Sequence, residues 1–263
     1  MAIALAATVF GLVGLVEDLV GIRALHRLAV QFAAGAFAAA FLLHGLTGPL
    51  LWKSIFAAGT VLWLVAFVNS YNFMDGINGI SVAQAVGAGA VWLMVGTVAG
   101  STALAAGGVV IAGAALGFAP FNVPKARMFL GDVGSYFVGA WLAAVAVLAL
   151  RSGVALEAVF APLALYAADT GTTLARRVAS RETWYLSHRD HVYQRLVDAG
   201  LSHVQVSAFV AGCIAVCGML GAVSLGDSLL ARVVADIAIA AVIVTYLLTP
   251  RRLARSRSTV VAA

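Results

Sequence analysis

The chain has 263 residues, of which 63% are hydrophobic and only 10% are charged. A soluble domain usually has about 25% charged residues, so this composition excludes an ordinary soluble protein and indicates an integral membrane protein. The formal net charge of +5 does not call for a nucleic-acid partner, because basic residues beside membrane helices contact anionic lipid or phosphate.

Long apolar runs follow one another along the chain, and a helix that crosses a bilayer needs roughly 20 such residues. We therefore predict an all-α, polytopic membrane helix bundle with about nine transmembrane helices. The predicted spans are residues 2–16, 28–43, 50–68, 80–98, 102–119, 133–150, 154–174, 206–224 and 229–248. No polar linker divides the chain, so we expect one domain, residues 1–263, that ends in a basic cytoplasmic tail, residues 250–263.

The basic residues are unevenly distributed between the two sides of the predicted bundle. Only Lys53, Arg151 and Arg232 lie at one side, whereas the other 13 of the 16 Lys and Arg residues lie in the opposite loops and the tail. The populated side is the cytoplasmic one by the positive-inside rule, which predicts an outside N-terminus and an inside C-terminus. We expect a multi-pass membrane protein whose polar loops face the cytoplasm.

The first polar loop begins with Glu17 and Asp18. Adjacent carboxylates at a membrane edge can bind a divalent cation, or can simply end a helix in water. The second polar stretch, residues 69–80, gathers the carboxylate of Asp75 with three carboxamides and two glycines. Its alternative interpretation is an ordinary loop between two membrane helices.

The third polar loop, residues 121–135, places Asp132 among glycines that let the backbone bend. Lys125 and Arg127 in this loop offer positive charge to a phosphate, or serve as inside-positive anchors. Asp169 lies in an apolar run, where a carboxylate indicates function by default, with a structural hydrogen bond to a nearby threonine as the alternative.

The fourth polar loop carries the histidines of the candidate site. His188 and His191 lie three residues apart, with Arg189 and Arg195 around them. Imidazole and guanidinium groups in this arrangement can contact phosphates. The four loops share one membrane face, and carboxylates beside cations suit Mg²⁺-assisted chemistry on phosphates. The sequence has no Walker-type loop and no dinucleotide fingerprint, which argues against ATP hydrolysis and redox chemistry.

These stretches, in the same order, resemble the polyprenyl-phosphate N-acetylhexosamine-1-phosphate transferases, a family that includes phospho-N-acetylmuramoyl-pentapeptide transferase. The matching residues are 17–18, 69–79, 128–135, Asp169 with Arg176 and Arg177, and the histidine loop. The resemblance implies transfer of a sugar 1-phosphate from a UDP-sugar to undecaprenyl phosphate, with release of UMP. It also implies Mg²⁺ as the cofactor, with Mn²⁺ as the alternative. The form His-Arg-Asp-His-Val-Tyr-Gln-Arg at residues 188–195 is most similar to the O-antigen branch, which uses N-acetylated, often 6-deoxy, sugars.

The resemblance also implies a role for individual residues. The implied catalytic residues are Glu17, Asp18, Asp75, Asp132, His188 and His191, and the implied metal ligands are Asp18, Asp75 and Asp132. The implied substrate-binding residues are Asn69, Asn72, Asn78, Lys125, Arg127, Phe129, Arg189 and Arg195. Phe129 matches an aromatic residue that stacks on uracil in relatives.

The chain departs from the family pattern in three ways. Glu17 and Asn78 stand where the family usually has Asp, and the family normally carries two more helices before Glu17. We therefore expect either a fragment or a genuine short form. The alternative functions are a membrane transporter or flippase, although its polar groups should lie at the bilayer midplane, and an inactive shortened relative. A homodimer is an open alternative to a monomer.

Overall fold

The computed structural model describes residues 1–183 and 190–261, and it describes side chains in these ranges up to residue 253. The elements are α1 (Ala2–Val20), α2 (Ala24–Leu42), α3 (Leu50–Met74), α4 (Ile80–Val98), α5 (Thr102–Asn122), α6 (Gly131–Arg151), α7 (Leu156–Phe160), the 3₁₀ helix η1 (Ala161–Leu163), α8 (Ala164–Ala179), α9 (Val192–Asp198), α10 (His203–Ala222), η2 (Val223–Leu225) and α11 (Leu229–Val261). Eight helices in the described ranges are long and apolar enough to cross a membrane. This confirms the predicted all-α polytopic bundle, as expected where lipid leaves backbone groups no partner outside their own helix.

The predicted span at residues 154–174 differs from the others, because it is divided into α7, η1 and α8. Pro162 lies in η1, where its ring removes a backbone N–H from the helical hydrogen bonds. Side chains of α4 bond to carbonyls along this segment: Trp92 Nε1 donates to Val159 at 2.9 Å and Gln84 Nε2 to Pro162 at 2.9 Å. The segment therefore runs antiparallel to α4. It consists of three helical pieces and not of the single helix that the apolar run predicted.

The C-terminal end of α3 lies further along the chain than predicted. The expected span ended at residue 68, whereas α3 continues to Met74, which is fully buried. The side-chain amide of Asn69 donates to the carbonyl of Val65 one turn earlier, at 2.8 Å. Asn69 and Asn72 are therefore on the last turns of a helix, and only the rest of the polar stretch is a loop.

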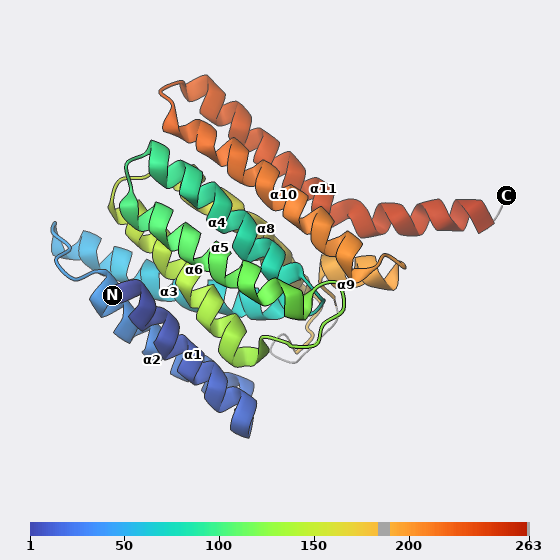
Figure 1. Ribbon diagram of the computed structural model, residues 1–263, viewed down its shortest axis with the longest axis horizontal. Coiled ribbons are helices and arrows are strands. Elements are labelled where there is room, and N and C mark those ends of the chain that lie inside the picture. Colours follow the sequence, from blue (N-terminus) through green and yellow to red (C-terminus); the bar gives the residue numbers. More distant parts are fainter. Residues whose placement is uncertain (184–189, 262–263) are drawn as a thin grey trace.

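The bundle has α6 near its centre. Figure 1 shows α1 and α2 along one side and α10 and α11 along the other, with α4, α5 and α6 between them. α6 packs against α1, α3 and α5, and Ala140, Ala143 and Ala144 on it have no exposed surface. Small residues let membrane helices approach closely. The outer helices expose apolar side chains such as Leu12 and Ile237, as helix faces in lipid do.

α1 meets the start of α6 at Gly14. A Cβ atom at this position would lie 2.2 Å from the backbone oxygen of Asp132, so only glycine fits there. Asp18 follows one turn later, on the same face of α1. The close approach of the two helices thus brings the Asp18 carboxylate to the N-terminus of α6.

Candidate active site

Asp18 binds the N-terminus of α6. Its Oδ1 accepts a hydrogen bond from the backbone N–H of Asp132 at 3.0 Å, and its Oδ2 accepts one from Val133 at 2.9 Å. α6 has no capping side chain of its own, and the free N–H groups at a helix N-terminus favour a carboxylate. Asp18 therefore joins the first and third polar stretches, with both of its oxygens engaged by the backbone.

Asn72 joins the second polar stretch to the third. Its Nδ2 donates to Asp132 Oδ1 at 2.7 Å and to the hydroxyl of the buried Ser135 at 2.9 Å. Asp132 is thus held from two sides, at its backbone by Asp18 and at its carboxylate by Asn72. Among the described residues none donates to Asp132 Oδ2, so this oxygen can take a cation or water.

Asp75 is the residue that follows α3. The Ser81 hydroxyl donates a short hydrogen bond to its Oδ1, and within the described ranges no group donates to its Oδ2. Burial raises the pKa of the Asp75 carboxyl to about 7, with a further contribution from the negative charge of Asp132. A carboxylate in such surroundings favours a cation beside it, because the cation restores the charge compensation that water would supply.

The donor set suits a Mg²⁺ site that the substrate completes. No group of three His, Cys, Asp or Glu side chains in the described parts of the chain is close enough to hold a metal ion. Mg²⁺, however, typically takes only one or two carboxylates together with water and substrate phosphates. Asp132 and Asp75 each have one carboxylate oxygen that accepts no hydrogen bond from the described residues. Asp18, the third predicted ligand, has both oxygens on the α6 backbone.

Glu17 lies on the last turn of α1. Its Oε1 forms an ion pair with Arg27 at 3.1 Å, and its Oε2 accepts from the backbone N–H of Ile22 at 3.2 Å. Neither contact reaches Asp132. The structure therefore gives Glu17 a place beside α2 and not in the junction that Asp18 forms.

Asn69 points toward α2, away from Asp132. Its Nδ2 donates to Gln31 Oε1 at 2.6 Å, and both residues line a cavity of about 310 Å³ between α2, α3 and α8. Gln31 was not among the residues predicted for the site. A lone carboxamide in an apolar run indicates a functional or structural polar contact, and Gln31 fits this pattern.

Asn78 ties the start of α4 to its neighbours. Its Nδ2 donates to the Pro124 carbonyl at 3.2 Å, its backbone N–H donates to His203 Nδ1 at 3.3 Å, and its own carbonyl accepts from Ser207 at 2.9 Å. The next residue, Gly79, donates its N–H to Asn122 Oδ1 at 2.7 Å. The loops before α4 and α6 are thus fixed to each other and to α10.

The connection between α5 and α6 exposes most of its predicted substrate-binding residues. Lys125 is exposed, and the Phe129 side chain is 75% exposed. Arg127 donates to the Pro120 carbonyl at 3.0 Å and lies over the ring of Phe121. The structure does not bring these three side chains into contact with Asp132.

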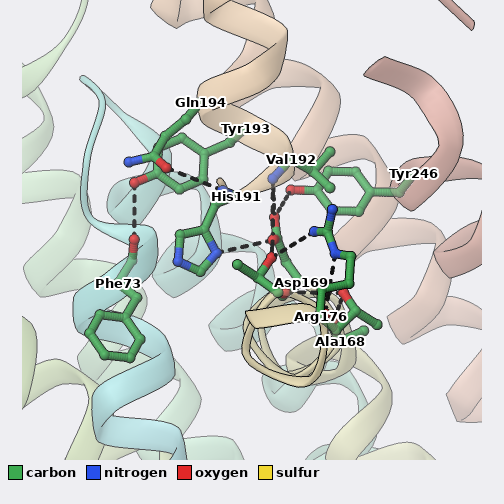
Figure 2. A network of polar contacts seen from close by, with 11 residues as sticks. Phe73, Ala168, Asp169, Arg176, His191, Val192, Tyr193, Gln194 and Tyr246 are labelled. Carbon is green, nitrogen blue, oxygen red and sulfur yellow. Dashed lines mark hydrogen bonds and ion pairs between the residues drawn. The ribbon is translucent and has the colours of Figure 1, made fainter. Parts of the chain in front are cut away.

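The histidine segment is attached to α8 through Asp169, as Figure 2 shows. Asp169 is completely buried, and its carboxylate lies 3.1 Å from His191 Nδ1 and accepts from Val192 N–H at 3.1 Å. Tyr246, on α11, donates to the same carboxylate at 2.7 Å. Thr173 donates a long hydrogen bond of 3.4 Å, so the expected threonine contact is the weakest of the set. His188 and Arg189 lie outside the described residues.

The histidine segment also contacts the residues on either side of Asp75, through Tyr193. Tyr193 donates from its hydroxyl to the Phe73 carbonyl at 2.9 Å, and a Cβ at Gly76 would lie 2.1 Å from that hydroxyl. The His191 ring is 3% exposed and lies beside the rings of Phe73 and Tyr193. In this structure His191 is therefore a buried link between α8 and the end of α3.

Arg195 lies apart from the Asp132 junction. It lines a polar cavity of about 260 Å³ together with Arg176, Arg177 and Arg251. This cavity lies at the C-terminal end of α8, between α9 and α11.

Comparison with known proteins places these features in a family. Residues 1–150 match the family described as Glycosyl transferase family 4. A probable undecaprenyl-phosphate N-acetylglucosaminyl 1-phosphate transferase of Bacillus subtilis is 28% identical over 147 residues, which cover 55% of this chain and 41% of that protein. A phospho-N-acetylmuramoyl-pentapeptide-transferase of Latilactobacillus sakei is 32% identical over 159 residues, 54% of this chain and 50% of that protein.

A third relative covers more of the chain. A decaprenyl-phosphate N-acetylglucosaminephosphotransferase of Mycobacterium leprae is 28% identical over 243 residues, 78% of this chain and 59% of that protein. The chain thus spans between 41% and 59% of the length of these three relatives.

Proposed function

The chain belongs to glycosyl transferase family 4, and on this premise we propose that it transfers a sugar 1-phosphate from a UDP-sugar to a polyprenyl phosphate and releases UMP. Two of the relatives are named for undecaprenyl or decaprenyl phosphate. The observation that carries the proposal is the junction at Asp132. There the side chains of Asp18 and Asn72 hold one carboxylate at the end of the bundle, with an oxygen left for a cation.

In the proposed reaction, an oxygen of the lipid phosphate attacks the β-phosphorus of the UDP-sugar. A new phosphoanhydride bond forms, the bond between the β-phosphorus and the bridging oxygen breaks, and UMP leaves with that electron pair. A bound Mg²⁺, or Mn²⁺ in its place, supplies positive charge that offsets the charge of the diphosphate.

The residues of the junction have separate tasks in this proposal. Asp132 and Asp75 hold the metal ion through their open oxygens. Asn72 fixes the orientation of the Asp132 carboxylate, and Asp18 fixes the backbone on which it stands. A group held in one orientation loses little free energy to reorganisation when charge develops on the phosphate.

The cavity between α2, α3 and α8 supports the placement of the lipid acceptor. Most of its lining is apolar, and Arg27, beside Glu17, lies on its wall. Gln31 Nε2 and Thr170 Oγ1 also belong to this lining and are buried with no hydrogen-bond partner in the described structure. Buried polar groups usually have partners, so these atoms favour a ligand that is apolar along its length and offers an acceptor atom. The phosphate end of a polyprenyl phosphate has this chemistry.

We also propose that the sugar is an N-acetylated hexosamine, which can be a 6-deoxy sugar. The proposed acceptor is undecaprenyl phosphate. The product would start an O-antigen or another cell-envelope polysaccharide, on the cytoplasmic face of a bacterial inner membrane. The histidine-loop form at residues 188–195 supports the sugar class, and the basic loops support the orientation. The exposed ring of Phe129, close to Gly131, supports stacking on uracil.

The test is UMP release by the purified full chain in detergent. UMP should form from UDP-N-acetylglucosamine or a 6-deoxy analogue only when undecaprenyl phosphate and Mg²⁺ are both present. UMP release without the acceptor, or no release with any of these donors, would contradict the proposal.

The variant that tests the metal site is Asp132→Asn, which keeps the size of the side chain and removes its charge. Loss of one ligating carboxylate should cost several kcal/mol of transition-state stabilisation, or about a thousandfold in turnover. Asp227→Asn, in the loop at the opposite end of the bundle, is the control and should keep normal turnover. Near-normal turnover of Asp132→Asn with an unchanged Mg²⁺ dependence would remove Asp132 from the metal site.

A further inference from the structure

Four arginines from three helices line one cavity at the C-terminal end of α8. The cavity has a volume of about 260 Å³, and its charged residues are Arg176, Arg177, Arg195, Arg251, Glu182 and Asp190. The four positive and two negative side chains give it a net charge of +2. Figure 2 shows Arg176 close to Asp169, so the cavity lies beside the Asp169 network.

The two carboxylates of the cavity both belong to Arg177. Its Nη1 lies 3.0 Å from Glu182 and 2.8 Å from Asp190, and its Nη2 donates to the Thr183 carbonyl. Arg177 Nε is buried and has no partner in the described part of the chain. Arg177 is thus largely neutralised, and the cavity still has donors to offer.

The other three arginines have no carboxylate partner among the described side chains. Arg176 donates to the hydroxyl of Thr173 at 3.0 Å and to the Thr172 carbonyl at 3.3 Å, both on its own helix. Arg195 comes from α9 and Arg251 from α11. Three guanidinium groups line this cavity and are not paired with its two carboxylates, which both bind Arg177. Such groups attract a phosphate, whose oxygens match the planar donor fork of arginine.

The position of Arg251 near the end of a long apolar helix indicates that the cavity lies at the depth of lipid headgroups. Arg251 lies within the last turn of the apolar part of α11, Leu229–Leu253, and directly follows Pro250. In Figure 1 the last part of α11 leaves the line of α10 and points away from the bundle. Proline causes such bends, and arginines at the end of a membrane helix lie at the headgroup level.

From these observations we propose that the cavity binds the headgroup phosphate of an anionic phospholipid. The net positive charge favours an anionic lipid over a zwitterionic one, and the depth of Arg251 favours a lipid over a free phosphate in water. The lipid phosphate would lie between α8, α9 and α11, each of which contributes at least one arginine to the lining of the cavity.

The test uses the full chain in nanodiscs that contain phosphatidylglycerol and phosphatidylcholine, with native mass spectrometry to count the lipid that stays bound. The wild type should retain phosphatidylglycerol in preference to phosphatidylcholine. Arg251→Gln should lower this retention about fivefold, which corresponds to about 1 kcal/mol. Arg252→Gln is the matched control, because Arg252 is exposed like Arg251 but does not line the cavity, and it should behave as the wild type.

A second variant guards against a local effect on α11. Arg176→Gln removes a cavity arginine from α8 and should give the same loss of bound phosphatidylglycerol. Equal retention of the two lipids by the wild type, or wild-type retention by both variants, would overturn the proposal. Inorganic phosphate is the competing probe. Its displacement of phosphatidylglycerol would assign the cavity to a free phosphate and would also overturn the lipid proposal.

Discussion

At the residue scale, the contacts of Asn78 explain why a carboxamide suits a position where the family usually has a carboxylate. Asn78 stands where the family usually has Asp, and its amide donates to the Pro124 carbonyl. A carboxylate at this position has no hydrogen to donate and would place negative charge beside a carbonyl oxygen. The carboxamide is therefore matched to the Pro124 carbonyl that it contacts.

We predict that Asn78→Asp lowers the stability of the protein by about 1 kcal/mol, the net value of one such hydrogen bond. The measurement is the melting temperature in detergent, beside that of Asn78→Ala. The alanine variant loses the same bond without adding a charge, so it should be the milder of the two. An aspartate variant as stable as the wild type would show that the bond to Pro124 contributes nothing.

At the element scale, α8 organises the candidate site from inside the bundle. Its Asp169 binds the N-terminal end of α9 and the Tyr246 hydroxyl of α11, so one carboxylate joins three helices (Figure 2). α6 is organised in a complementary way, because a residue of α1 caps it from outside. The N-termini of α9 and α6 are thus each bound by a carboxylate from another helix.

We predict that Asp169→Ala destabilises the protein by about 3–5 kcal/mol, because the buried donors of Val192 and Tyr246 lose their acceptor. Hydrogen exchange should increase in α9 more than in α4. Tyr246→Phe removes one bond of the set and should cost about 1 kcal/mol. Thr172→Val is the control, because the Thr172 hydroxyl bonds only to backbone carbonyls of its own helix, α8. Unchanged exchange in α9 after Asp169→Ala would contradict this role.

We also predict a large effect at the contact of α1 with α6. Gly14→Ala places a methyl group 2.2 Å from the Asp132 carbonyl, so the helices must separate and Asp18 must leave the α6 N-terminus. The expected cost is about 1–3 kcal/mol in stability, as for overpacking in a core. Gly113→Ala on α5 has open space around it and should be neutral or slightly stabilising. Equal melting temperatures for the two variants would refute the close approach.

At the scale of the whole molecule, the candidate site residues lie at one end of the bundle. The loops before α4 and α6, the α1–α2 turn and α9 meet there, whereas the loop before α11 lies at the opposite end (Figure 1). The basic residues have the same asymmetry, which underlies the proposed cytoplasmic site.

We predict that the two ends react differently with a thiol reagent that does not cross membranes. In a background without Cys213 and Cys217, Asp227→Cys should react in intact cells. Lys125→Cys should react only after lysis, and both positions are exposed in the structure. Labelling of Lys125→Cys in intact cells would reverse the topology and move the site to the outside.

Composition and motifs along the chain were enough to predict the class of protein, the number of long apolar helices to within one, and the family. These depend on composition and local motif, since each membrane helix satisfies its own backbone and shows itself as an apolar run. The match over residues 1–150 confirms the family resemblance that the motifs indicated.

Only the tertiary structure decided which polar groups meet. Asn69 and Asn72 lie one turn apart on α3, yet one faces Gln31 on α2 and the other faces Asp132 on α6. Partners of this kind depend on the rotation of each helix and on which helix packs beside it. The partner of Asp169 could not be predicted from the sequence either, because Tyr246 lies 77 residues away in an apolar run that carries no motif. A pattern along one chain reports spacing on one helix, whereas a site at the ends of several helices is set by how they pack.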